Sequence, residues 1–218
     1  MVKRENFIGQ LEGLSNSLLK LNNETKEAFQ KAMDALKNHD HTLAKEIIEH
    51  DCVINNKELS INEDAILIIA KQQPVAIDLR FIISIIKISY ELERMADLAV
   101  NISRAVVRIG SYEVPAVMNE EIYKMADLAL IMLDDTMEAF KNQDASLAKR
   151  ASKIDDDIDV LYEQFISTIT STIQTETLEI QTEYAFIARH IERYADHVTN
   201  IAEHVVYLVK GKHYDLNE

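Results

Sequence analysis

The chain has 218 residues and carries 37 acidic against 23 basic side chains, which gives a formal net charge of −14 at pH 7. This balance disfavours binding of nucleic acid or of an anionic membrane through bulk electrostatics, and it favours cations or a partner with a basic surface. Solubility alone explains the charge equally well. The chain has only 4 glycines and 2 prolines, and Ala, Leu, Ile, Glu and Lys recur at helical spacing, so we expect an all-α fold.

The spacing of apolar residues predicts six long helices. In chain order they are expected at residues 5–38, 42–71, 75–109, 115–142, 146–173 and 178–210. Pro74 ends the second helix, because proline lacks an amide donor and disfavours helix in the residue before it. Gly110 and Gly211 stand where the C-terminal caps of the third and sixth helices are expected, and Pro115 suits the first turn of the fourth.

The first three predicted helices are repeated in the last three. Residues 33–45 align without a gap on residues 137–149 with eight identities, a density that chance would rarely give in one register. The motif E-R-x-A-D-x-x-x-N-I also occurs twice, at residues 93–102 and 192–201. We therefore expect two tandem, pseudo-symmetric three-helix bundles, the first over residues 1–111 and the second over residues 112–218.

The sequence favours a soluble cytoplasmic protein. Cys52 is the only cysteine, so no disulfide can form within the chain, which suits a reducing compartment. The basic N-terminus is not followed by the continuous apolar run of a signal peptide. The most apolar segment, residues 81–88, is far too short to span a bilayer, so we expect no direct membrane insertion.

Each repeat carries acidic side chains at four-residue spacing on two helices, and residues at this spacing share one helix face. The pairs are Asp51 with Asn55 and Glu93 with Asp97 in the first repeat, and Asp155 with Asp159 and Glu192 with Asp196 in the second. Asn101 and Asn200 follow one step further along the third and sixth helices. If the second and third helices of a repeat are antiparallel neighbours, both pairs meet in one groove.

Converging carboxylates bind hard cations and first-row metals, so each groove is a candidate metal site. Glu192 and Asp196 lie opposite the apolar residues of their helix, which places the expected site near the surface. The alternative interpretation is a solvated acidic face, which is common on helices. The repeated asparagines count against it, because a solvated face does not need the same amide twice.

Other chemistry is weakly supported. His190, His197 and His204 lie on one heptad line, but this line is more than about 90° from the carboxylates at 3.6 residues per turn. We interpret it as a surface or partner-facing row. No Glu-x-x-His motif of a ferritin-like di-iron enzyme occurs, and no nucleophile elbow, P-loop or dinucleotide fingerprint is present. The sequence therefore does not favour an enzyme.

The sequence contains QQPVAIDLRFI at residues 72–82, ELERMADLAVNI at 91–102 and HIERYADHVTNIAEHVVYLVKG at 190–211. Together these segments closely resemble the PhoU family of bacterial regulators of phosphate uptake. The resemblance covers nearly the whole chain. It implies a pair of three-helix bundles, commonly dimeric, with multinuclear iron or zinc sites on acidic surface motifs.

Carried over to this sequence, those motifs fall on Glu93 and Asp97, Asp155 and Asp159, and Glu192 and Asp196. Asp51 also matches, but Asn55 stands where a carboxylate would complete the pattern, so the first site is expected to hold fewer or weaker metals.

The resemblance also implies a role, which is to lower phosphate uptake and phosphate-starvation signalling when phosphate is plentiful. The expected partners are the ATPase of the phosphate ABC transporter and a membrane sensor histidine kinase, and the expected assembly is a homodimer. Two alternatives remain open. One is a generic helical scaffold with solvated acidic faces, and the other is a metal-dependent hydrolase or oxidase, which would need open coordination and a positioned base.

Overall fold

The structure is a computed structural model that describes residues 2–110, 116–171 and 178–216, and this part of the chain is helical with no strand. The helices are α1 (Val2–Asn38), α2 (His41–Gln72), α3 (Ala76–Ile109), α4 (Ala116–Asn142), α5 (Ala145–Ala151), α6 (Ile154–Ser171) and α7 (Leu178–Lys210). The predicted all-α class is confirmed. The unit boundary between residues 111 and 112, the position of Pro115 and the predicted helix end at Ile173 lie outside the described residues.

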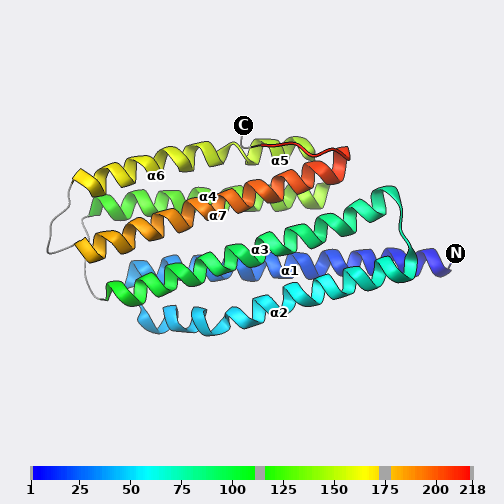
Figure 1. Ribbon diagram of the computed structural model, residues 1–218, viewed down its shortest axis with the longest axis horizontal. Helices are drawn as coiled ribbons and strands as arrows, with labels where there is room; N and C mark the ends of the chain where they lie inside the picture. The colour runs from blue at the N-terminus through cyan, green and yellow to red at the C-terminus, as the bar shows by residue number, and fades with distance from the viewer. Residues whose placement is uncertain (1, 111–115, 172–177, 217–218) are drawn as a thin grey trace.

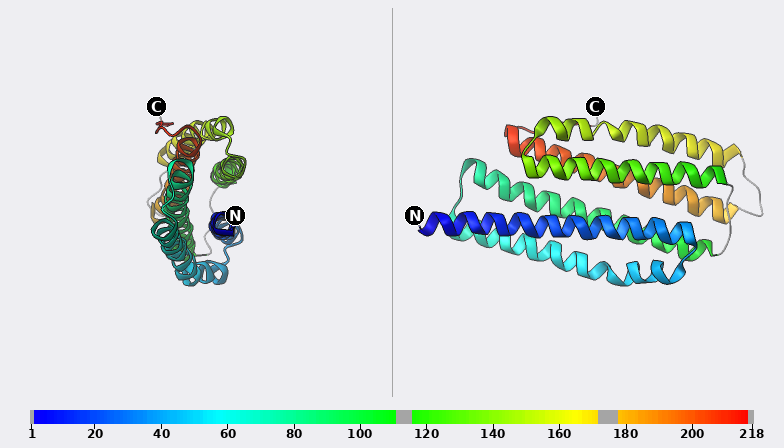
Figure 2. Two further views of the ribbon diagram at one scale, coloured as in Figure 1. Left: turned by 90° about the vertical axis from the view of Figure 1, so that its right-hand side faces the viewer. Right: turned by 180° about the vertical axis from the view of Figure 1, so that it is seen from behind.

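The long helices run side by side along the long axis of the molecule (Figure 1). Helices α1, α2 and α3 pack on one another, and α4 packs with α5, α6 and α7 in the same way. The two bundles meet chiefly through α3 and α7, which lie at the centre of the molecule, while α1 and α4 lie on one side of this central pair (Figure 2). The predicted tandem three-helix bundles are therefore confirmed.

One continuous apolar core joins the two bundles. The ring of Phe29 on α1 stacks on that of Tyr194 on α7, with centroids 4.1 Å apart, and Phe81 on α3 stacks on Phe140 on α4 at 6.0 Å. Lys26 on α1 forms an ion pair of 2.6 Å with an α4 carboxylate. Because both ring pairs join helices of different bundles, the two repeats pack against each other and are not independent units.

The repeat is visible in the caps that begin α2 and α5. Asp40 Oδ1 accepts hydrogen bonds from the backbone amides of Thr42 and Leu43, at 3.0 and 2.9 Å. Asp144 does the same for Ser146 and Leu147, at 2.8 and 3.1 Å. Each aspartate satisfies amides that have no partner inside the helix. Asp40 and Asp144 align in the internal repeat because each caps the helix that follows it with the same pair of hydrogen bonds.

The predicted fifth helix is broken into α5 and α6, whereas α2, its equivalent, is continuous. At the break, Ser152 Oγ donates to the carbonyl of Lys149 at 3.2 Å. The amides of Lys153 and Asp155 bond to carbonyls three residues back, at 3.3 and 3.1 Å. Serine competes locally for backbone acceptors, and such tight turns interrupt an α-helix. The break places Asp155 in the first turn of α6.

The predicted helix ends of α2, α3 and α7 are confirmed. Gln73 follows α2 in the left-handed region (φ 48°), immediately before Pro74. Gly110 and Gly211 follow α3 and α7 with φ of 68° and 71°, a conformation that glycine adopts without steric cost. None of the described helices is both long and apolar enough to cross a membrane.

Candidate metal-binding grooves

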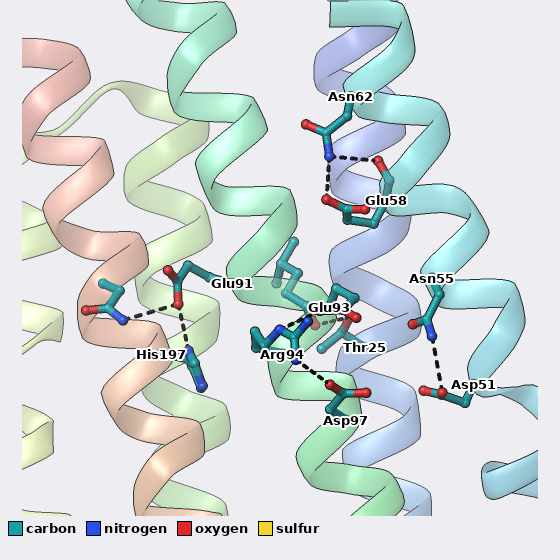
Figure 3. A network of polar contacts seen from close by, with 12 residues as sticks. Thr25, Asp51, Asn55, Glu58, Asn62, Glu91, Glu93, Arg94, Asp97 and His197 are labelled. Atoms are coloured by element: carbon teal, nitrogen blue, oxygen red, sulfur yellow. Dashed lines mark hydrogen bonds and ion pairs between the residues drawn. The ribbon is translucent and has the colours of Figure 1, made fainter.

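The first groove lies between α2 and α3 and contains Asp51, Asn55, Glu93 and Asp97. The carboxylates of Asp51 and Asp97 point toward one another across it (Figure 3). Asn55 Nδ2 donates to Asp51 Oδ2 at 3.3 Å. The amide therefore contacts the carboxylate of its own pair, and two segments far apart in the sequence bring their acidic pairs together as the four-residue spacing predicts.

The guanidinium group of Arg94 balances much of the negative charge in the first groove. Arg94 Nε lies 2.9 Å from Glu93 Oε2, and Arg94 Nη1 donates to Asp97 Oδ2 at 3.0 Å. One guanidinium thus bridges both carboxylates that α3 contributes (Figure 3). Such planar, multi-donor contacts are the geometry in which arginine holds carboxylates best.

The second groove lies between α6 and α7 and contains Asp155, Asp159, Glu192 and Asp196. Glu192 and Asp155 are only 8% and 9% exposed. Thr199 Oγ1 donates to Asp155 Oδ2 at 2.8 Å, and Arg189 forms an ion pair with Glu192 Oε1. This burial exceeds what the sequence indicates, because α7 packs against α3, α4, α5 and α6 and exposes only a narrow strip.

Burial and like charge raise the pKa of the groove carboxyls. Burial, with the neighbouring charge of Asp196, raises the pKa of Glu192 to about 7 and that of Asp155 to about 6. The same causes raise the pKa of Asp159. In the first groove, burial and the charge of Asp97 raise the pKa of Asp51 and that of Glu93. Each groove therefore holds acidic groups that are stabilised by a proton or by a cation.

Several oxygen atoms in the grooves are suited to a metal ion. Asp51 Oδ1, Asp155 Oδ1 and Glu192 Oε2 are buried and have no hydrogen-bond partner within the described part of the chain. A buried carboxylate oxygen without a donor is costly, and a hard cation would satisfy it. In residues 2–110, 116–171 and 178–216, however, no three Asp, Glu, His or Cys side chains converge closely enough to hold an ion. Coordination would therefore require side-chain rotation.

The predicted asparagine ligands have other partners. Asn200 Nδ2 donates to Glu91 Oε2 on α3 at 3.2 Å, and Asn101 Oδ1 accepts from Arg104 at 3.2 Å. His197 Nδ1 lies 2.6 Å from the same Glu91 oxygen (Figure 3). Asn200 and His197 therefore join α7 to α3, across the contact between the bundles.

The interpretation of the histidine row as a surface feature is wrong for His197, which faces α3. Burial lowers the pKa of His190, and burial together with the charge of Lys87 lowers that of His204 to about 4. Both rings are therefore neutral at physiological pH. The row belongs to the contact between α3 and α7, because the central position of α7 leaves no free face on that side.

Sequence reasoning missed Glu58 and Thr199 as residues of the grooves. Glu58 on α2 adds its charge to those acting on Glu93, and Asn62 donates to it. Its place three residues after Asn55 continues the same helix face, so the spacing rule used for the acidic pairs could have found it. Thr199 has no such signal, because Val100 stands at the equivalent position of the first repeat.

Comparison with known proteins identifies the class. The PhoU domain model matches the chain twice, at residues 18–106 and 122–205, one match in each bundle. The chain is similar to the Phosphate-specific transport system accessory protein PhoU homolog of Clostridium acetobutylicum, with 32% identity over 99% of both chains. It is also 32% identical to the PhoU accessory protein of Escherichia coli K12, over 73% of this chain and 66% of that protein.

Solved structures agree with the sequence matches. The crystal structure of the phosphate transport system regulatory protein PhoU from Streptococcus pneumoniae superposes with a TM-score of 0.90 at 33% identity, covering 96% of this chain and 99% of that one. PhoU from Pseudomonas aeruginosa gives 0.89 at 30% identity, covering 94% and 100%. The chain thus shares its two-bundle helical fold with PhoU proteins of known structure. The chain belongs to the PhoU family.

Proposed function

We propose that this chain is a non-enzymatic cytoplasmic regulator that lowers phosphate uptake and phosphate-starvation signalling when phosphate is plentiful. The observation that carries the proposal is the match along 99% of an accessory protein named for phosphate-specific transport. The regulator acts by contact with the ATPase of the phosphate ABC transporter and with a sensor histidine kinase, and it works as a homodimer.

Metal ions, iron or zinc, complete the two grooves in this proposal. Asp155, Asp159, Glu192 and Asp196 would hold ions in the second groove, and Asp51, Glu93 and Asp97 would do so in the first. The ions supply positive charge that neutralises the buried carboxylates and links α6 to α7 and α2 to α3. Support comes from the buried oxygen atoms that lack donors and from the raised pKa of Glu192 and Asp155.

The proposal is tested in cells that lack the endogenous protein. We expect the wild-type chain to restore low phosphate uptake and low phosphatase expression in phosphate-rich medium, and purified protein to bind the transporter ATPase. A chain that is expressed and folded but leaves both readouts at their starvation level would contradict the regulatory role. The binding measurement then shows whether such a chain fails to contact the transporter ATPase, or contacts it without lowering phosphate uptake.

A generic helical scaffold is the second candidate, and one observation favours it. As the side chains are placed, no three potential ligands in the described part of the chain converge on one point. In a scaffold the acidic faces are only solvated and need no metal. Normal regulation by a variant that binds no metal would support the scaffold and would remove the ions from the proposal while leaving the regulatory role intact.

A further inference from the structure

A cavity of about 310 Å³ lies within the first bundle, where α1, α2 and α3 meet. Its floor is apolar and its rim is charged. The floor is formed by Ala28, Leu43, Ile47, Ile54, Ala96 and Val100. Small-molecule sites begin at roughly this volume and combine an apolar lining with a few polar groups. A short aliphatic chain would fit on this floor.

The rim has more carboxylates than cations. Glu27 is already paired with Lys31 at 2.7 Å, which leaves Glu24, Glu46 and Asp51 as the other acidic groups of the lining. Glu24 Oε2 and Asp51 Oδ1 are both buried without a hydrogen-bond partner in the described residues. A ligand that brings N–H donors and positive charge would satisfy these oxygen atoms.

Two further groups near the rim, Lys57 and His50, do not supply the missing hydrogen-bond donors. Lys57 forms an ion pair with the other oxygen of Glu24, Oε1, and so leaves Oε2 free of a donor. His50 also lines the cavity, but its side chain is exposed. The cavity therefore combines buried acceptor oxygen atoms that lack donors with an apolar floor, which suits a molecule with a cationic head and an apolar stem.

The second bundle does not repeat the cavity's chemistry. In the repeat register, the positions of Glu24, Ala28 and Glu46 are taken by Leu128, Met132 and Arg150. Met132 is fully buried, so its side chain fills volume that the alanine leaves open. The two acidic positions become apolar and basic. The cavity is thus specific to the first bundle, unlike the acidic grooves, which both bundles share.

We propose that this cavity binds an aliphatic ammonium ion, with the carbon chain on the apolar floor and the ammonium group at Glu24 Oε2. A bare metal ion makes no use of the apolar floor, and a neutral apolar ligand would leave the buried oxygen atoms without donors. The inference goes beyond the proposed regulatory function, because it adds an organic ligand at a cavity that shares only Asp51 with the metal grooves.

The test is a titration of chelator-treated, full-length protein with 1-aminopentane, followed by amide chemical shifts in two-dimensional NMR. We expect saturable shifts confined to residues around the cavity. 1-Pentanol, which keeps the stem without the charge, and ammonium chloride, which keeps the charge without the stem, should bind at least about tenfold more weakly. Equal effects of either probe, or shifts spread over the acidic grooves of both bundles, would overturn the proposal.

Two substitutions sharpen the test. Ala28→Met fills the floor as the second bundle does, and Glu24→Gln keeps the shape while removing the charge. Each should weaken 1-aminopentane binding by at least about tenfold, or about 1.4 kcal/mol, whereas Glu138→Gln on α4 should leave it unchanged. Because Glu24→Gln changes no volume, it remains informative if Ala28→Met fails to fold. Unchanged affinity in Glu24→Gln would overturn the proposal. Because the protein is treated with chelator, this result does not depend on whether the grooves bind metal.

Discussion

In the first groove Arg94 contacts both Glu93 and Asp97, whereas in the second groove Arg189 contacts Glu192 and the residue equivalent to Arg94, Arg193, is exposed. The two grooves share their acidic spacing but differ in how the charge is balanced. An arginine that pairs with two carboxylates reduces the need for a metal ion. In the second groove Arg189 pairs with Glu192, one of four carboxylates, and Asp155 and Glu192 are buried, so the second groove should bind metal more tightly.

The largest difference between the grooves should appear in metal affinity. We expect Asp155→Asn with Glu192→Gln to weaken Zn²⁺ binding to the second groove by more than about 100-fold, since even indirect contacts to a metal contribute about 10- to 100-fold. Isothermal titration of the metal-free protein measures this. The matched variant, Asp51→Asn with Glu93→Gln, should remove only a weaker phase of binding. Equal losses in both variants would contradict the ranking.

Restoring the missing carboxylate should narrow the difference. Asn55→Asp gives the first groove the residue that Asp159 supplies in the second, and we expect Zn²⁺ affinity there to rise about tenfold, because ligand charge sets affinity at oxygen sites. Asn56→Asp adds the same charge on an exposed face of α2 and serves as the control. If both substitutions raise the affinity equally, the effect is general electrostatics and not coordination.

The pH dependence of stability should also separate the grooves. Folding raises the pKa of Glu192 from 4.5 to about 7, so between these pH values the folded state holds more protons than the unfolded chain. The free energy of unfolding of metal-free protein should therefore fall as pH rises, by on the order of 1 kcal/mol between about pH 5.5 and 7.5.

Chemical denaturation at a series of pH values measures this trend. Glu192→Gln should remove most of it, because the amide does not titrate, and Glu93→Gln should remove less. Saturating metal should flatten the trend in the wild-type protein by holding the carboxylates ionised. A free energy of unfolding that rises with pH over this range would show that the groove carboxylates are stabilised as ions without metal.

The smallest effect is expected on the fold itself. Glu192→Ala with Asp196→Ala should leave the helical circular dichroism signal nearly unchanged, because neither residue belongs to the apolar core and the removed charges repel each other. The first-groove equivalent, Glu93→Ala with Asp97→Ala, should cost somewhat more stability because it leaves Arg94 without its partners. Collapse of the helical signal in the second-groove variant would show that Glu192 supports the core.

Much of this comparison could be predicted from the sequence, because it rests on helical periodicity. Four-residue spacing brought Asp51 toward Asp97 and Asp155 toward Glu192 once α2–α3 and α6–α7 were neighbours, and the internal repeat predicted that packing twice. The broken fifth helix could not be predicted in this way. It depends on a local hydrogen bond from Ser152 that competes with the backbone, and periodicity does not report such competition.

Features that depend on contact between the bundles were also beyond the sequence. The helical spacing alone indicates that Glu192 lies near the surface and that His197 lies on a free face. The prediction for His197 omits the packing of α3 on α7, which puts Glu91 beside it. The prediction for Glu192 omits the packing of α6 on α7, in which little of its area stays exposed. The partners of Arg94 and Arg189 depend on rotamers, since each arginine has carboxylates within reach on its own helix.

The central claim, that the acidic grooves bind metal and that the second groove binds it more tightly, is tested most directly by the metal content of protein purified without an affinity tag. Elemental analysis of the wild type should give stoichiometric iron or zinc per chain. Glu192→Ala with Asp196→Ala should lose most of it, and Glu93→Ala with Asp97→Ala should retain most. No metal in the wild type, or equal loss from the two variants, would contradict the account.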